Sequence, residues 1–286
     1  MGAHTGKAGK LFVVATPIGN LQDMSARAAG VLAAVHLIAA EDTRHSKKLL
    51  AHFGVGTRLI ALHDHNEKEM AERLLRQLAG GDDVALISDA GTPLISDPGY
   101  RLVRAAHAAG ISVVPVPGPS ALTAALSVAG LPTDRFRFEG FLPAKQVARR
   151  QRLDALAGET ITLVFYESSH RIIDSLQDMA ACLGDERPAV VARELTKLYE
   201  TVLCGTLAEL HARIGGDPQQ QKGEFVVLVH GAGVNEDELE AQARLALTVL
   251  LEELPLKQAA ALAARITGAS KNRLYEYGLA IKNNQS

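Results

Sequence analysis

Cysteine and long apolar runs are scarce in this 286-residue sequence, and both absences narrow its class. The two cysteines, Cys182 and Cys204, share no C-x-x-C spacing and have no paired histidines beside them. Neither a disulfide framework nor a zinc site is indicated, and we expect no bound metal. No segment approaches the about 18 to 20 apolar residues of a membrane helix, and residues 1–10 lack an apolar signal core. We expect a cytoplasmic protein that does not enter a membrane.

The sequence motifs of several common enzyme classes are also absent. The sequence holds no G-x-x-x-x-G-K-[ST], and no G-x-G-x-x-G follows its first predicted strand. A P-loop and a standard dinucleotide or classical Rossmann methyltransferase site are therefore unsupported. G-x-S-x-G and H-E-x-x-H are missing as well, which argues against common hydrolase and metalloprotease sites.

The first part of the chain alternates strand-like and helix-like patterns. With 47% hydrophobic residues and a formal charge of -2, the chain has room for two compact domains and a small extra one. Strand-like runs occur at Leu11–Ala15, His36–Ala40, Leu59–Leu62, Val84–Ser88 and Ile111–Val116. Helical spacing occupies Ser25–Val35, Ser46–Phe53, Glu67–Ala79 and Tyr100–Ala109. This alternation predicts a mostly parallel sheet with helices on both faces.

A second set of elements follows Pro117–Pro119. Strand-like runs occur at Phe136–Phe141, Ile161–Tyr166, Ala189–Glu194, Tyr199–Leu207 and Phe225–His230. No full helix fits between Ala189 and Leu207, which favours a mixed or antiparallel sheet. We therefore expect an α/β fold with two α/β domains, at residues 1–117 and 118–234, and a small helical domain at residues 235–286.

The charge of the tail reverses at Leu254–Pro255. Glu236–Glu253 holds six acidic residues and one arginine, whereas Pro255–Ser286 holds five basic residues and one acidic. Leu256–Ile266 and Ser270–Ile281 read as two helices around a tight turn, with Ser270 as N-cap and Lys271 and Arg273 in the first exposed turn. This pattern resembles a helix-turn-helix that contacts nucleic acid, and its alternative is a helical hairpin that only packs or dimerises.

The most informative stretch is Ala85–Gly99, where an apolar run ends in two carboxylates, two glycines and two prolines. Small molecules bind open α/β sheets in the crevice at the carboxyl ends of the strands, and Asp89 and Asp97 would stand at that edge. Gly91 permits a close backbone approach. Asp97 has a second interpretation, as the cap of a helix that begins near Pro98.

Seven short motifs carry a resemblance to a known family. In chain order they are Thr16–Leu21, Ala40–Arg44, Ser88–Pro93, Pro117–Ser120, Gly140–Pro143, Arg193–Lys197 and Gly223–Phe225. They resemble the ribosomal RNA small-subunit methyltransferase I family, over roughly Leu11 to His230, and the tail is similar to that family's helical extension. The resemblance implies a fold of tetrapyrrole methylase type with S-adenosylmethionine bound in a cleft between the two α/β domains. It also implies a homodimer and 2'-O-methylation of a cytidine in the decoding region of 16S rRNA in the small ribosomal subunit.

Site residues follow from the same resemblance. Those implied for cofactor binding are Thr16, Pro17, Asp89, Gly91, Thr92, Ser120, Ala121 and Tyr166. Asp89 would suit the amine or ribose end of the cofactor. The candidates for catalysis on the RNA side are Arg44, His45, His63 and His65. A 2'-hydroxyl must be aligned with the sulfonium methyl and lose a proton, which a neutral histidine can accept. The alternative for the histidines at positions 63 and 65 is that they are solvated loop residues.

A basic face is the expected contact of the main body with RNA. Lys145, Arg149, Arg150 and Arg152 cover neighbouring positions at helical spacing, and the alternative is an ordinary solvated surface. Lys271 and Arg273 would add contacts from the tail. Ser169 departs from the family pattern, which usually has proline there, and we expect this change to loosen its loop.

Two other functions stay open on the sequence. One is a methylase of a tetrapyrrole precursor or a protein side chain in the same superfamily, against which the loop Thr16–Gly19 and the basic tail argue. The other is a ligand-sensing regulator that binds nucleic acid through the helix-turn-helix. Transfer of a methyl group to RNA would exclude the regulator.

Overall fold

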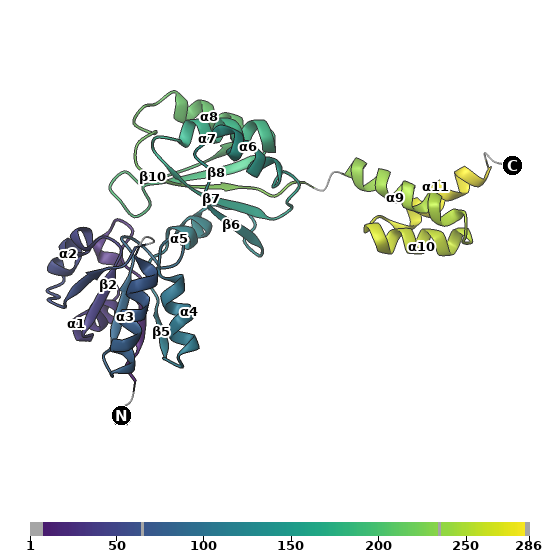
Figure 1. Ribbon diagram of the computed structural model, residues 1–286. Helices are drawn as coiled ribbons and strands as arrows, with labels where there is room; N and C mark the ends of the chain where they lie inside the picture. The colour runs from purple at the N-terminus through teal and green to yellow at the C-terminus, as the bar shows by residue number, and fades with distance from the viewer. Residues whose placement is uncertain (1–7, 64–65, 234–235, 284–286) are drawn as a thin grey trace. The chain divides into compact units, whose positions relative to one another are not determined.

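The structure, a computed structural model, describes residues 8–63, 66–233 and 236–283, which form two compact units. The first unit is residues 1–230 and the second is residues 231–286. The first contains two five-stranded sheets, and the second contains the helices α9 to α11 (Figure 1). No helix in the described ranges has both the length and the apolar character that a membrane span requires.

The first sheet is parallel throughout, as the alternating pattern predicts. Its strands are β1 (Leu11–Val14), β2 (Leu37–Ala40), β3 (Leu59–Ala61), β4 (Val84–Ile87) and β5 (Val113–Val116), in the order β3-β2-β4-β1-β5. Side chains alternate between faces, so Leu86 packs in one core and Ile87 in the other. Helices α1 (Ala26–Ala34) and α2 (Thr43–His52) cover the Ile87 face, and α3 (Glu67–Ala79) and α4 (Tyr100–Ala108) cover the Leu86 face. A short 3-10 helix, η1 (Leu21–Asp23), follows β1.

Two helix starts near the carboxyl edge of this sheet differ from the sequence prediction. Helix α2 begins at Thr43 rather than Ser46, because the Asp42 carboxylate caps it by accepting the Arg44 N–H at 2.8 Å. The interpretation of Asp97 as a helix cap is wrong. The N-cap position of α4 is Gly99, and buried Glu67 of α3 accepts the Gly99 N–H at 3.1 Å.

The second sheet is mixed, as expected from its closely spaced strands. Its strands are β6 (Phe136–Phe141), β7 (Thr162–Ser168), β8 (Pro188–Arg193), β9 (Thr201–Thr206) and β10 (Glu224–Val229). Their order is β6-β7-β10-β8-β9, and the β6–β7 pair is parallel while the other pairs are antiparallel. Helices α6 (Gln146–Asp154), α7 (Ile172–Leu183) and α8 (Leu207–Gly215) cover one face. Helix α5 (Ala121–Val128) packs on the other face through Leu122, Ala125 and Leu126.

The second unit is a three-helix arrangement with its own core. It consists of α9 (Glu236–Leu251), α10 (Leu256–Thr267) and α11 (Lys271–Asn283). Small and apolar side chains fill its centre, including Leu247, Ala260 and Leu274. Gly268 ends α10 in the left-handed conformation, with φ of 79°, and so makes the tight turn that the sequence predicts before α11.

Candidate functional site

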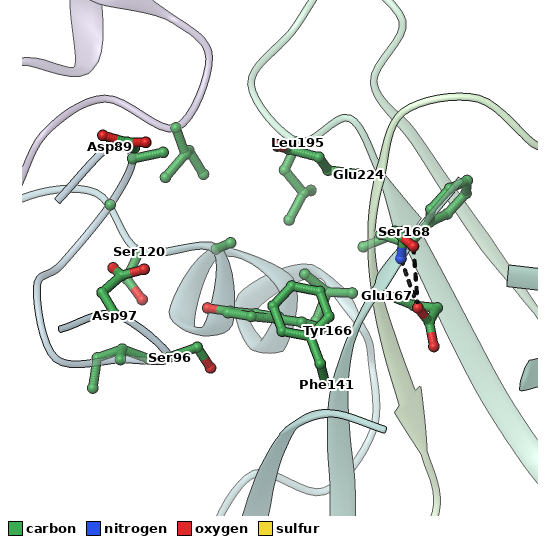
Figure 2. A pocket seen from close by; sticks show the side chains of 18 of the residues that line it. Asp89, Ser96, Asp97, Ser120, Phe141, Tyr166, Glu167, Ser168, Leu195 and Glu224 are labelled. Atoms are coloured by element: carbon green, nitrogen blue, oxygen red, sulfur yellow. Dashed lines mark hydrogen bonds between the residues drawn. The ribbon is translucent and has the colours of Figure 1, made fainter. Parts of the chain in front are cut away.

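A cavity of about 440 Å³ lies in the first unit, within the size range of small-molecule sites. Loops that follow strands of the first sheet form one side, and β7, β10 and the loop after β8 form the other. Figure 2 shows Asp89 and Asp97 on the first side and Tyr166, Ser168 and Glu224 toward the second. The cavity therefore lies at the carboxyl edge of the parallel sheet, where such sheets bind ligands.

The loop after β4 is tied to the loop after β1 by a short antiparallel bridge. The Thr16 N–H donates to the Gly91 carbonyl at 2.9 Å, and the Gly91 N–H donates back at 3.0 Å. Gly91 has φ of +82°, which favours glycine. Leu94 and Ser96 also have positive φ, of 73° and 69°. Strained residues of this kind cluster at ligand sites, where the surrounding structure holds them.

Two carboxylates of this loop line the cavity and have different surroundings. Asp89 accepts the Asp42 N–H at 2.9 Å and so holds the start of α2 beside the cavity. Burial raises the pKa of Asp97 to about 6, against a hydrogen bond with Ser88 that lowers it, and the nearby charge of Asp89 raises it further. A cationic ligand would favour the ionised form of Asp97 in this position.

Tyr166 connects the second sheet to the start of α5. Its hydroxyl accepts the Leu122 N–H at 3.1 Å, and its ring makes edge contacts with Phe138 and Phe141. Burial raises the pKa of this phenol, which therefore stays protonated near neutral pH. On the other side of the α5 start, the Thr92 hydroxyl donates to the Pro119 carbonyl at 3.0 Å. The start of α5, which lines the cavity, is thus bonded to strand β7 of the second sheet and to the loop after β4 of the first.

Glu167, the residue after Tyr166, is buried and fully engaged. It forms an ion pair with Arg171 at 2.8 Å and accepts the Ser175 hydroxyl at 2.6 Å. It also accepts the Ser168 N–H at 2.8 Å. These bonds join residues on both sides of Ser169 to one buried carboxylate.

The wall from the second sheet carries a lysine between two glutamates. Lys197 Nζ donates to Glu194 Oε1 at 2.8 Å and to Glu224 Oε2 at 2.9 Å. Burial alone would lower the pKa of Lys197, but the hydrogen bonds and charges of both glutamates outweigh it and raise that pKa. The Lys197 stem lies against Gly19, where an added Cβ would stand 2.3 Å from the lysine Cγ.

Most of the residues expected to bind the cofactor line this cavity. The six that do are Asp89, Gly91, Thr92, Ser120, Ala121 and Tyr166. Thr16 and Pro17 are buried and do not line it, whereas the next residue, Ile18, does. Thr16 acts one step away, because its bridge to Gly91 holds the lining loop.

The expected catalytic residues do not gather in the cavity. Of the described candidates, Arg44, His45 and His63, none lines it, and His65 lies outside the described residues. Arg44 is exposed on α2 and pairs with Asp42 at 3.2 Å. Glu41, which lines the cavity, lies a few residues before Arg44 and His45 along the chain.

The expected basic face on α6 is narrower than its sequence suggests. Arg149 is buried and bonds Asp178 at 2.7 Å, so it is not part of an exposed surface. Arg150 also bonds Asp178, at 2.6 Å, but stays partly exposed. Lys145 is exposed at the start of α6. Asp178 on α7 explains the inward turn of Arg149, because a fully buried carboxylate needs a cationic partner.

In the second unit, both expected RNA contacts are exposed. Lys271 and Arg273 lie in the first turn of α11. Arg273 also borders a small groove with Arg244 and Tyr277, and the Arg244 guanidinium stands 4.7 Å from the Tyr277 ring centre.

Sequence reasoning missed several lining residues that were within its reach. Glu41, Lys197 and Glu224 all lie inside motifs that carry the family resemblance, yet the resemblance assigns none of them an individual role in cofactor binding. Phe141 stands in a further such motif, and its exposed ring borders the cavity. Membership of a family motif was the sequence feature that could have identified these residues. Only the fold shows which residues of each motif line the cavity.

Comparisons with known proteins identify the families that the two parts of the chain resemble. A family profile described as Tetrapyrrole (Corrin/Porphyrin) Methylases matches residues 10–211, and one described as RsmI C-terminal HTH domain matches residues 237–282. A Pseudomonas aeruginosa protein named Ribosomal RNA small subunit methyltransferase I is 61% identical over 95% of this chain and 97% of its own length. A protein of the same name from Escherichia coli O157:H7 is 57% identical over 95% of each chain.

Solved structures of lower identity share the fold. A cobalt precorrin-4 methyltransferase superposes with a TM-score of 0.58 at 18% identity, over 77% of this chain and 94% of that one. A uroporphyrin-III-C-methyltransferase from Thermus thermophilus gives 0.52 at 20% identity, over 78% and 94%. At these identities the likeness concerns the fold alone, and it matches the expected tetrapyrrole methylase architecture.

Proposed function

The chain belongs to the ribosomal RNA small subunit methyltransferase I family, and from this premise we propose how its cavity serves that activity. The protein is an S-adenosylmethionine-dependent methyltransferase that acts on ribosomal RNA of the small subunit. We propose that its target is the ribose 2'-hydroxyl of a cytidine in the decoding region of 16S rRNA. The observation that carries the assignment is the placement of the family motifs around one acidic cavity at the sheet edge.

The cavity fits the charge of the proposed cofactor. S-adenosylmethionine supplies an electrophilic methyl group on a sulfonium and carries a second positive charge on its ammonium. Asp89 and Asp97 place carboxylates where those charges can be held, and the raised pKa of Asp97 fits a group that a cation would return to its ionised form. Gly91, Thr92, Ser120, Ala121 and Tyr166 complete the proposed cofactor site. Thr16 holds Gly91 through their bridge, and Pro17 follows Thr16 in the same loop.

The reacting ribose would reach the cavity, and the rest of the RNA would contact the protein outside it. We assign Arg44, His45, His63 and His65 to this contact with substrate, because the described members of the set lie away from the cavity lining. Lys145, Arg150, Lys271 and Arg273 are exposed cations that would meet phosphates.

The remaining proposals concern organisation. We propose that residues 1–117 and 118–234 are two domains that share the cofactor, with residues 235–286 as an RNA-binding extension. The protein would act as a homodimer in the cytoplasm, where its ribosomal substrate is found.

The test is transfer of a labelled methyl group from S-adenosylmethionine to small ribosomal subunits that lack the modification. We expect label at one alkali-resistant linkage, since a methylated 2'-oxygen cannot attack its phosphate. Asp89→Asn keeps an oxygen for the Asp42 N–H but removes the charge, and it should weaken cofactor binding by about 10- to 100-fold. Asp134→Asn, on an exposed side chain, is the matched control. Label in an alkali-sensitive linkage would refute 2'-O transfer.

A further inference from the structure

The lysine and glutamates of the second wall have no role in the function proposed so far. Lys197 and Glu224 line the cavity, and Glu194, which is not among the lining residues, bonds both of them. Glu194 Oε1 accepts both Lys197 Nζ at 2.8 Å and the Glu224 N–H at 2.9 Å. The three side chains therefore form one connected group on the wall that faces the Asp89 loop.

The backbone around this group is held in unusual conformations. Glu194 and Thr196 have positive φ, of 50° and 67°. Gly223 has φ of +104°, and a Cβ there would lie 2.5 Å from the Glu194 Cγ. The Lys197 stem packs equally closely against Gly19, where a side chain would collide with it. Strain of this kind persists only where surrounding contacts fix it, so the position of the lysine ammonium is specified rather than incidental.

The Lys197 ammonium places a positive charge in an otherwise acidic cavity. The other charged residues that line it in the described part of the chain are the carboxylates Glu41, Asp89, Asp97 and Glu167. Lys197 is thus the lining cation among the described residues. An ammonium has three N–H donors, and the glutamates take two, which leaves one for an oxygen of a ligand.

The two glutamates differ in access. The Glu194 side chain is 17% exposed, whereas the Glu224 side chain is 77% exposed. A hydroxyl of a large substrate that enters from outside would reach Glu224 and not Glu194. Glu194 therefore holds the lysine, and Glu224 is placed to meet the substrate.

We propose that Lys197 binds the attacking ribose 2'-oxygen through its third N–H and that the Glu224 carboxylate takes the hydroxyl proton. This inference rests on the proposed 2'-O transfer. A bond forms between the 2'-oxygen and the methyl carbon while the carbon–sulfur bond breaks, and that electron pair stays on sulfur as a neutral thioether. The hydroxyl proton passes to Glu224, and the ammonium stabilises the negative charge that develops on oxygen.

The decisive variants are Lys197→Met and Glu224→Gln. Methionine keeps an unbranched stem along Gly19 and removes the ammonium. Lys222→Met is the matched control, because Lys222 is an exposed lysine of the neighbouring loop that bonds Gln219 at 3.2 Å and does not line the cavity. Single-turnover methyl transfer to small subunits measures the rate, and calorimetry with S-adenosylhomocysteine measures occupancy of the cofactor site.

We expect each variant to lower the rate at saturating substrates by about 100-fold or more, as loss of one oxyanion donor does. The double variant should be little slower than either single one, because the two groups act together. Affinity for S-adenosylhomocysteine should change by no more than about threefold, a shift too small to explain the rate.

Two results would overturn the inference. One is a normal rate in both variants, and the other is a loss of cofactor affinity as large as the loss of rate, which would place Lys197 in the cofactor site. If Lys197→Met does not fold, Glu224→Gln on its exposed side chain decides alone. Wild-type protein that binds S-adenosylhomocysteine but leaves subunits unmethylated would refute the proposed function instead, so the two failures are distinguishable.

Discussion

Replacing Asp97 with asparagine should stabilise the protein without cofactor at pH 8 while weakening cofactor binding. Asp97 lies half-buried in the cavity lining, and burial raises its pKa from 3.8 to about 6. At pH 8 the folded protein must hold this carboxylate ionised in a poorly solvated place close to Asp89. Asparagine has nearly the same shape and can accept the same hydrogen bond from Ser88, but it has no charge to desolvate.

The magnitude follows from the pKa. A pKa moved from 3.8 to about 6 corresponds to about 3 kcal/mol. Because the side chain is only half-buried, solvent screening reduces this to about 1 to 2 kcal/mol. The penalty is complete above pH 6, where the carboxyl is ionised in both folded and unfolded protein. It disappears as the pH falls from about 6 toward 4, because the folded protein then binds a proton that the unfolded chain does not.

Thermal unfolding at pH 8 and pH 5 tests this prediction. Asp97→Asn should raise the melting temperature by about 2 to 8 °C at pH 8 and by about half as much at pH 5, where part of the folded protein is already protonated at this carboxyl. Asp134→Asn, on an exposed side chain, should change neither value. An Asp97→Asn protein that melts no higher than wild type at pH 8 would show that burial of this carboxylate carries no cost. One that keeps its full advantage at pH 5 would show that the gain does not come from ionisation of Asp97.

Three further predictions concern residues that position the site or the fold. Arg149→Met leaves Asp178 buried with one of its two guanidinium partners lost, so the free energy of unfolding in urea should fall by about 3 kcal/mol. An unchanged urea midpoint would contradict the stabilising role of this ion pair. Gly91→Ala strains a φ of +82° beside the cavity, and calorimetry should show cofactor affinity lowered about tenfold, with normal affinity as the contrary result. Glu67 of α3 caps α4 with a charged carboxylate, and Glu67→Gln weakens that cap. The melting temperature of this variant should fall below that of Glu69→Gln, which changes an exposed residue of α3.

Local pattern was enough to predict the sheets. The central strands β2 and β4 are buried on both faces, so each appears as a continuous apolar run. The helices between the strands of this sheet show helical spacing of their apolar residues. Val84–Ile87 is a clear case, since it is apolar throughout and ends at the carboxylate Asp89. The mixed second sheet followed from the lack of a helix between Ala189 and Leu207, where β8 and β9 pair directly.

Long-range pairs were beyond local pattern. Nothing near Arg149 in the sequence indicates that it turns inward, because its partner Asp178 lies 29 residues away. Gly99 likewise depends on Glu67, 32 residues earlier, for the cap that the alternative interpretation assigned to Asp97. Motif membership identified the neighbourhood of Lys197, but its contact with Gly19 joins segments from opposite ends of the first unit.

If the second unit binds RNA as we propose, its separate core makes the choice of substrate modular. Helices α9, α10 and α11 bury their own apolar residues and form a compact body distinct from residues 1–230. A methyl-transfer scaffold joined to such a body can acquire a new RNA target by exchange of the appended helices, while the cavity stays intact. A chimaera that carries a different RNA-binding module after His230 should therefore methylate the RNA that this module binds. The bound module would raise the local concentration of the catalytic unit at that RNA, and the methyl-transfer step itself would stay the same.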